Sequence, residues 1–264
     1  MLQRLIFCCL SFIYSAQAAF EIQSVAPAVI ARGGIVSLYP GASNPAALVE
    51  NRGFCCGLDY SNLYGIKNLK AWDLLLLHTN RSHTGVAFQI NVLGNTIYQE
   101  KTFGLSYGRQ LTKVLACGLT GNYYDLTISN YRHTGAWGIN CGAQFFPDST
   151  LSFALLFQNV NAPRICGGRE ALPQVFAFGW RWLPLRRGEL SGEIFKDTCR
   201  PFIYRTGIRI EFLQCLCLLG GVQFNPDRLS GGLELNLSKI RLALAIQHHT
   251  TLPYTLYCGC SISI

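Results

Sequence analysis

Runs of alternating polarity, each about ten residues long, fill the chain from Phe54 onward and are separated by breaks rich in glycine, asparagine, proline, aspartate and serine. In residues 202–212, one set of alternate positions holds phenylalanine, tyrosine, threonine and isoleucine, and the other is richer in arginine, glycine and glutamate. In residues 239–247, isoleucine and leucine alternate with lysine, arginine, alanine and glutamine. Successive side chains of a strand point to opposite faces, whereas a helical period would mix the two sets. The pattern therefore predicts many strands, each with one apolar face.

The composition indicates that these apolar faces meet lipid. Half of the residues are hydrophobic and 14% are charged, against roughly 25% charged in an average soluble domain. A membrane helix needs about 20 mostly apolar residues, and the longest candidate after the N-terminus, residues 212–224, is shorter and contains Gly220 and Gly221. Only helices and closed barrels satisfy the whole backbone inside a bilayer. We therefore expect an all-β, antiparallel transmembrane barrel in a bacterial outer membrane.

The alternating runs number about fourteen, an even count that suits a barrel with both ends of the chain on the periplasmic side. They lie near residues 54–61, 71–78, 83–93, 101–110, 113–128, 133–146, 150–159, 174–183, 189–197, 199–212, 214–225, 228–237, 239–248 and 254–264. The last run resembles the C-terminal signal that the barrel-assembly machinery reads, although Ile264 stands where phenylalanine is typical. The predicted partners are thus outer-membrane lipid and this machinery.

The first 18 residues read as a cleavable signal peptide. Arg4 gives a positive start, residues 5–14 are apolar, and Ala16-Gln17-Ala18 is a small-residue cleavage site. A stop-transfer helix is the alternative, but the apolar stretch is too short for it. Cleavage after Ala18 removes one positive charge, so the net charge of +8 becomes +7. The basic residues are dispersed and show no nucleic-acid-binding motif, so no nucleic-acid partner is expected.

Ten of the twelve cysteines remain after the signal peptide is removed, because Cys8 and Cys9 lie within it. An even number in an oxidising compartment permits disulfides. However, pairs such as Cys215 with Cys217 share one strand face and do not readily bridge each other. Most cysteines are therefore interpreted as small apolar residues facing lipid. A soluble, disulfide-rich sandwich remains the alternative fold.

Residues 19–53 differ from the rest of the chain, since they are rich in alanine, glycine and proline and do not alternate. Asn44-Pro45 reads as a turn, and residues 46–50 as a possible short helical turn. Irregular backbone is tolerated at membrane depth where protein surrounds it. The predicted organisation is a signal peptide over residues 1–18, a plug or hatch segment over 19–53 and the barrel over 54–264.

The stretch Gly41-Ala42-Ser43-Asn44-Pro45-Ala46-Ala47-Leu48 resembles the hatch of FadL-type hydrophobic-compound transporters, and still more the shorter PorV/PorQ-like proteins of that superfamily. Residues 103–111 and 229–237 are similar in style to strands of the same superfamily. The chain departs from the pattern in having no acidic residue in 35–43. The resemblance implies a channel for hydrophobic or small compounds, with Asn44, Pro45 and Ala46 near a ligand path. The alternative it implies is a non-transporting partner in a type IX-like protein secretion system.

The alternation also predicts which polar side chains point into the barrel. These lumen-facing residues are Arg181, Arg205, Arg209, Glu211, Glu234, Arg241 and Gln247. They could line a passage or could simply pair with one another. The five histidines fit no metal-binding spacing, and no GxSxG motif is present, so no enzyme activity, metal or cofactor is expected.

Overall fold

The structure is a computed structural model, and it describes residues 19–22, 24–41, 43–129, 133–198 and 200–264. The predicted signal peptide, residues 1–18, lies outside the described residues. Within the described part, no helix is both long and apolar enough to cross a membrane.

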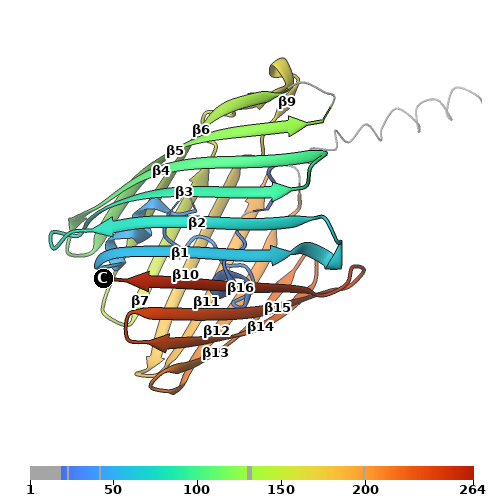
Figure 1. The fold of residues 1–264 in the computed structure, drawn as a ribbon. Helices are drawn as coiled ribbons and strands as arrows, with labels where there is room; N and C mark the ends of the chain where they lie inside the picture. Colours follow the sequence, from blue (N-terminus) through green and yellow to red (C-terminus); the bar gives the residue numbers. More distant parts are fainter. Residues whose placement is uncertain (1–18, 23, 42, 130–132, 199) are drawn as a thin grey trace, which may run out of the picture.

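Fourteen antiparallel strands close into a barrel (Figure 1). Each strand pairs with its neighbours in sequence, and the first and last strands pair with each other, from Cys55 opposite Ser263 to Asn62 opposite Leu256. The barrel strands are β1 (Gly53–Asn62), β2 (Lys70–Thr79), β3 (Thr84–Gly94), β4 (Tyr98–Thr112), β5 (Leu115–Ile128), β6 (Thr134–Phe145), β7 (Leu151–Gln158), β10 (Val175–Leu185), β11 (Gly188–Asp197), β12 (Ile203–Leu213), β13 (Leu216–Phe224), β14 (Arg228–Leu237), β15 (Ile240–His249) and β16 (Thr255–Ser263). The predicted antiparallel barrel of about fourteen strands is confirmed.

Short elements complete the fold. The connection between β7 and β10 carries the small pair β8 (Arg164–Ile165) and β9 (Glu170–Ala171), with the 3-10 turn η4 (Cys166–Gly168) between them. The turn η3 (Leu63–Gly65) follows β1. Before the barrel come α2 (Pro27–Ile30) and the 3-10 helix η2 (Pro45–Glu50).

The two ends of the barrel differ in what they hold. We call the end where β1 begins and β16 finishes the near end; there, the amide of Phe54 donates to the carbonyl of Ile264 at 3.0 Å. The opposite, far end holds the long β7–β10 connection. In Figure 1 the C-terminus marks the near end.

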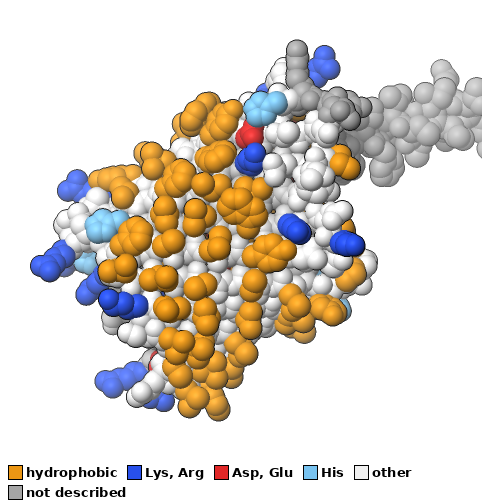
Figure 2. Space-filling model, viewed as in Figure 1, with side chains coloured by type: hydrophobic (Ala, Val, Ile, Leu, Met, Phe, Trp, Pro, Cys, Tyr) orange, Lys and Arg blue, Asp and Glu red, His pale blue; other side chains and the backbone are white. Residues whose placement is uncertain are grey.

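The outer face is apolar, as the alternation predicts. On β12, Tyr204, Ile208 and Ile210 are exposed, while Arg205 and Gly207 between them are buried. Figure 2 shows hydrophobic side chains over the middle of one face, with lysine and arginine toward its edges. Such a band is what lipid-facing strands require.

Some residues on the inner face are apolar because they pack against chain inside the barrel. Leu75 and Leu77 of β2 are buried against Leu48, so the run Leu74–Leu77 is apolar on both faces of its strand. Ile203 of β12 packs in a second cluster with Val29 and Val36. The inner face therefore supplies the core of the molecule.

One predicted strand begins later than expected. The run 199–212 becomes β12 only at Ile203, because β11 ends at Asp197 and the described residues 198 and 200–202 belong to neither strand. The side chain of Asp197 accepts a hydrogen bond from the amide of Arg200 at 2.6 Å, which fixes this turn. Pro201 has no amide hydrogen to contribute to a strand ladder.

None of the nine cysteines in the described part forms a disulfide. Cys258 and Cys260 are exposed on the outer face of β16, opposite Tyr60 and Leu58. This matches the interpretation of outward cysteines as small apolar residues. Cys217 differs, since it is buried and points inward beside Arg209.

Candidate functional site

We call residues 19–52 the N-terminal segment. Its described residues, 19–22, 24–41 and 43–52, lie inside the barrel. The helix α2 contacts β14, β15 and β16, and η2 contacts β2 to β6 on the other side. Most of the segment between Val25 and Val49 is buried. Figure 1 shows this segment, in blue, behind the front strands.

Glycines on the inner face make room for the segment. A Cβ atom placed at Gly142 would lie 2.0 Å from the Oδ1 atom of Asn44, and one at Gly118 would lie 2.6 Å from the carbonyl carbon of Pro45. On the opposite wall, a Cβ at Gly221 would lie 2.1 Å from the amide nitrogen of Gly33. Glycine within a strand often marks such a close backbone approach. The barrel wall is thus shaped to fit this particular segment.

The predicted hatch residues Asn44, Pro45 and Ala46 form the start of η2. The Oδ1 atom of Asn44 accepts a hydrogen bond from the amide of Ala46 at 3.0 Å, as an N-cap residue does. Pro45 occupies the first helical position, where its missing amide hydrogen costs nothing. All three residues are buried, so this turn is held between the walls of the barrel.

A buried carboxylate anchors the middle of the segment. Glu193 of β11 accepts hydrogen bonds from the amides of Val36 at 2.9 Å and Ser37 at 2.6 Å through one oxygen. Its other oxygen pairs with Arg205 of β12 at 2.6 Å. Arg205 also lies over the ring of Phe195, 4.3 Å from its centroid. The charge of Arg205 is therefore satisfied by the wall and, through Glu193, linked to the segment.

Two further ion pairs join the segment to the wall. Arg32 pairs with Glu189 of β11 at 2.7 Å. Glu50 pairs with Arg181 of β10 and accepts a hydrogen bond from Gln144 at 2.6 Å. Alternation in the sequence predicted inward positions for Arg181 and Arg205. It did not indicate Glu50, Glu189 or Glu193, because alternation shows which face a side chain is on and not which residue it pairs with.

The structure places the remaining predicted lumen-facing residues on inner positions of β12, β14 and β15. Arg209 pairs with Glu234 at 3.1 Å. Arg241 is exposed within the near end, and its Nε atom donates to Asn236 at 3.1 Å. Glu211 is half-buried opposite Cys217. Gln247 is buried and accepts from the hydroxyl of Tyr257 at 3.5 Å.

The N-terminal segment leaves a cavity on each side of it. The near-end cavity has a volume of about 340 Å³ and is bordered by Tyr39, Asp59, Arg181, Arg209 and Arg241. The far-end cavity has a volume of about 300 Å³ and mixes apolar walls with arginines, among them Phe195, Ile203, Arg205 and Arg228. Arg181, Arg209, Glu234 and Arg241 thus share the near-end cavity, whereas Arg205 and Gln247 border the far-end one.

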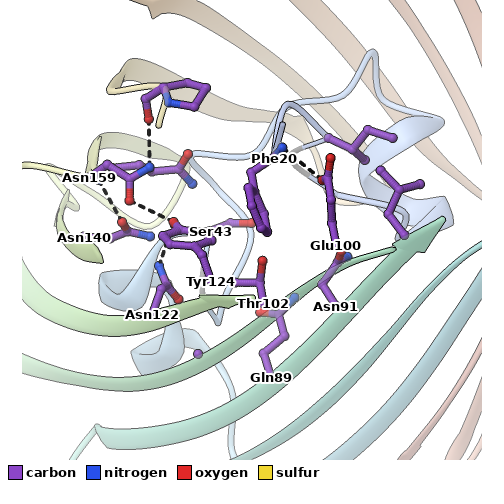
Figure 3. Close-up of a pocket in the computed structure, with 15 residues that line it drawn as sticks. Phe20, Ser43, Gln89, Asn91, Glu100, Thr102, Asn122, Tyr124, Asn140 and Asn159 are labelled. Carbon is purple, nitrogen blue, oxygen red and sulfur yellow. Dashed lines mark hydrogen bonds between the residues drawn. The ribbon is translucent and has the colours of Figure 1, made fainter. Parts of the chain in front are cut away.

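A third, smaller cavity of about 70 Å³ lies between the segment and strands β3 to β6 (Figure 3). Several residues that line it are linked by hydrogen bonds. The hydroxyl of Tyr124 donates to the Oδ1 atom of Asn159 at 2.8 Å, and the amide of Asn159 donates to Asn140 at 3.0 Å. The Nδ2 atom of Asn159 donates to the carbonyl of Pro173 at 2.7 Å. This network ties the β7–β10 connection to the inner wall, and no short motif in the sequence indicates it.

In the described part of the chain, no three residues among histidine, cysteine, aspartate and glutamate come together as a possible metal site. The arrangement instead offers a lined interior, divided by one segment of the chain. A closed antiparallel barrel with cavities on either side of an internal segment is the class of protein that the fold and the site define.

Comparison with solved structures shows a similar fold in proteins that are described as channels and transporters. No family model matches the chain, and no curated protein matches it in sequence. Among solved structures, a CymD monoaromatic hydrocarbon channel is similar, with a TM-score of 0.70 and 11% identity, over 93% of this chain and 99% of the other. The toluene transporter TodX of Pseudomonas putida gives a TM-score of 0.64 and 12% identity, over 92% and 98%. A FadL homologue of Pseudomonas aeruginosa gives 0.66 and 9%, over 90% and 98%.

These likenesses concern the fold, since the identities are low. They agree with the FadL-type half of the resemblance drawn from the sequence, and they offer no support for its PorV/PorQ-like half. The named structures are channels and transporters rather than enzymes.

Proposed function

We propose that this protein is an outer-membrane channel for hydrophobic or small compounds. The observation that carries the proposal is a closed fourteen-stranded barrel whose outer face is apolar and whose interior keeps cavities on both sides of the N-terminal segment. A barrel of this width has room for a passage or a plug. Its fold is that of proteins described as hydrocarbon channels, so monoaromatic hydrocarbons are the first compounds to test.

The N-terminal segment is proposed to act as the hatch of this channel, together with Gly53 at the start of β1. Asn44, Pro45 and Ala46 would hold its near-end turn against Gly118 and Gly142. Compounds would enter one cavity and leave through the other when the segment shifts. Arg181, Arg209, Glu211, Glu234 and Arg241 would line the near-end part of this path, and Arg205 and Gln247 the far-end part.

The membrane location and assembly route are parts of the same proposal. The signal peptide, residues 1–18, would direct export and then be cleaved off, and the barrel-assembly machinery would recognise β16. Its outer residues Leu256 and Ile262 are exposed, as is Ile264 directly after it. Outer-membrane lipid would then cover the apolar band. No nucleic acid or cofactor has a role in this function.

Uptake by proteoliposomes tests the transport function. Vesicles with the intact protein should take up a radiolabelled monoaromatic hydrocarbon faster than vesicles with a refolded barrel of unrelated function, and glucose should serve as the polar comparator. Uptake no faster than in the comparison vesicles, for every small hydrophobic probe tried, would overturn the proposal.

Replacing residues 24–50 with a glycine–serine linker tests the hatch. If the segment closes the lumen, the shortened protein should admit glucose that the intact protein excludes. Because loss of the segment can also prevent closure of the barrel, Gly142→Ala provides a second variant, which pushes on Asn44 and Pro45 only. Gly121→Ala is its control. A Cβ at Gly121 meets no atom within 4 Å. Unchanged glucose exclusion in both variants would contradict a hatch.

A further inference from the structure

A buried carboxylate that forms no ion pair with any described cation lies where the N-terminal segment begins. Glu100, near the start of β4, is 5% exposed. One of its oxygens accepts a hydrogen bond from the amide of Phe20 at 2.9 Å, and the other accepts from the hydroxyl of Tyr98 at 2.5 Å. Figure 3 shows the Phe20–Glu100 contact at the edge of the small cavity. Glu100 thus fixes the first described residues of the segment to the barrel wall.

The surroundings of Glu100 carry negative charge. Among the described residues, none of the ion pairs closer than 4 Å includes Glu100. Instead, two further carboxylates, Glu21 and Glu170, lie near enough to repel its charge. Glu21 has its own cation in Arg200. Removing an ionised carboxylate from water without a cation is costly, at several kcal/mol or more. Among the described residues, therefore, no cation offsets the charge of Glu100.

Ala19 lies directly beside this site. Its side chain is 5% exposed and packs with Tyr124, Leu126, Ile165 and Leu172. Backbone bond lengths keep adjacent amide nitrogens less than about 4 Å apart. The nitrogen of Ala19 is therefore within about 4 Å of the Phe20 nitrogen, which itself contacts Glu100. The two oxygens of one carboxylate together have about four lone-pair positions. Glu100 can therefore accept a further hydrogen bond.

We propose that the α-ammonium of Ala19, released when the signal peptide is cleaved after Ala18, binds in this pocket and pairs with Glu100. Hydrolysis of the Ala18–Ala19 bond by a signal peptidase consumes one water and leaves a carboxylate on Ala18 and an amine on Ala19. The amine takes up a proton at neutral pH, because α-amino groups have a pKa of about 8. Cleavage thus creates a positive charge directly beside the buried carboxylate of Glu100.

The consequence is a link between processing and closure. The new ion pair adds to the hydrogen bond at Phe20 and fixes the start of the N-terminal segment to the barrel wall. Glu193 fixes the middle of the segment in the same way. An uncleaved chain lacks this charge at Ala19. The inference rests on the predicted cleavage site and on the fold, and it stands or falls independently of what the channel carries.

The first measurement is the intact mass of the exported protein, which should correspond to a chain that begins at Ala19. The second is the rate at which the α-amine reacts with an amine-specific reagent at pH 7, followed by mass spectrometry of the N-terminal peptide. The other titratable or charged groups around the site are Tyr98, Tyr124, Glu21, Glu170 and Arg200. A rise of one unit in the pKa of the amine lowers its reactive fraction about tenfold. We therefore expect labelling about tenfold slower in the natural chain than in Glu100→Gln.

Two controls separate an ion pair from a general effect of mutation. Glu211→Gln removes a half-buried inner carboxylate at the near end and should leave α-amine labelling unchanged. A chain with two glycines added before Ala19 moves the ammonium away from Glu100. In that chain Glu100→Gln should lower the heat-unfolding midpoint less than it does in the chain beginning at Ala19.

A different N-terminus, equal labelling rates with and without Glu100, or equal losses of heat stability in the two chains would each overturn the proposal. If Glu100→Gln does not fold, labelling of the natural chain against the glycine-extended chain still decides the question. Slow labelling only in the natural chain supports the pocket, and equal rates contradict it.

Discussion

Gly142 shows at the scale of a single residue how closely the barrel and the N-terminal segment fit. Its missing side chain leaves the space that the Oδ1 atom of Asn44 fills. We predict that Gly142→Ala destabilises the protein by about 1–3 kcal/mol, the usual cost of overpacking. Urea unfolding in detergent measures this change, and Gly121→Ala, which points into open space, should cost much less. Equal effects of the two substitutions would show that the segment does not lie where it is placed here.

Glu193 carries a second prediction at this scale. Its carboxylate is fully buried and serves the amides of Val36 and Ser37 as well as Arg205. Glu193→Gln leaves the guanidinium of Arg205 buried without its anion, which typically costs about 3–5 kcal/mol. The double variant Glu193→Gln/Arg205→Met should recover part of that loss. No recovery would mean that the pair is not coupled.

Single residues also show where sequence reasoning ends. The alternation on β12 and β15 gave the inward direction of Arg205 and Gln247, and the resemblance pointed to Asn44-Pro45-Ala46. Neither the alternation nor the resemblance indicates the partners of these residues. A partner such as Glu193 or Glu50 depends on how the N-terminal segment packs inside the barrel. The inner-face glycines were a usable signal, since Gly142 and Gly207 stand at strand positions that point inward.

At the scale of elements, periodicity placed all fourteen strands to within a few residues. It worked because lipid and lumen impose opposite demands on successive residues of every strand. It was least informative at β2, where Leu74–Leu77 is apolar on both faces, and at β12, which Pro201 and the turn at Asp197 delay. The short pair β8–β9 carries no periodic signal and was not predicted.

The outer face of β15 supplies a prediction that belongs to the element. Leu244 is exposed at the middle of the strand, with Leu233 and Cys258 beside it. In a membrane, Leu244→Lys should cost about 2–4 kcal/mol, whereas Leu237→Lys, at the end of β14, should cost about 0–1 kcal/mol. Refolding into lipid vesicles over a urea series measures both. Equal small costs would indicate that this face meets water.

At the scale of the whole molecule, two features define the fold: closure of the sheet into a barrel and insertion of the N-terminal segment into its interior. Pairing of β1 with β16 removes the open edges of the sheet, which a bilayer does not tolerate. The N-terminal segment then fills much of the interior and divides the remaining space into separate cavities. Charged residues inside are mostly paired, as with Arg32 and Glu189 or Arg209 and Glu234. This arrangement is the basis on which we propose a channel with a built-in hatch.

Closure of the barrel in a membrane is the claim on which all else depends. The most direct test is the gel mobility of the protein extracted from the outer-membrane fraction, with and without boiling. A closed barrel resists the detergent until it is heated, so the unboiled and boiled samples should run at different positions. A single position for both samples, with the protein recovered in the soluble periplasmic fraction, would contradict this account.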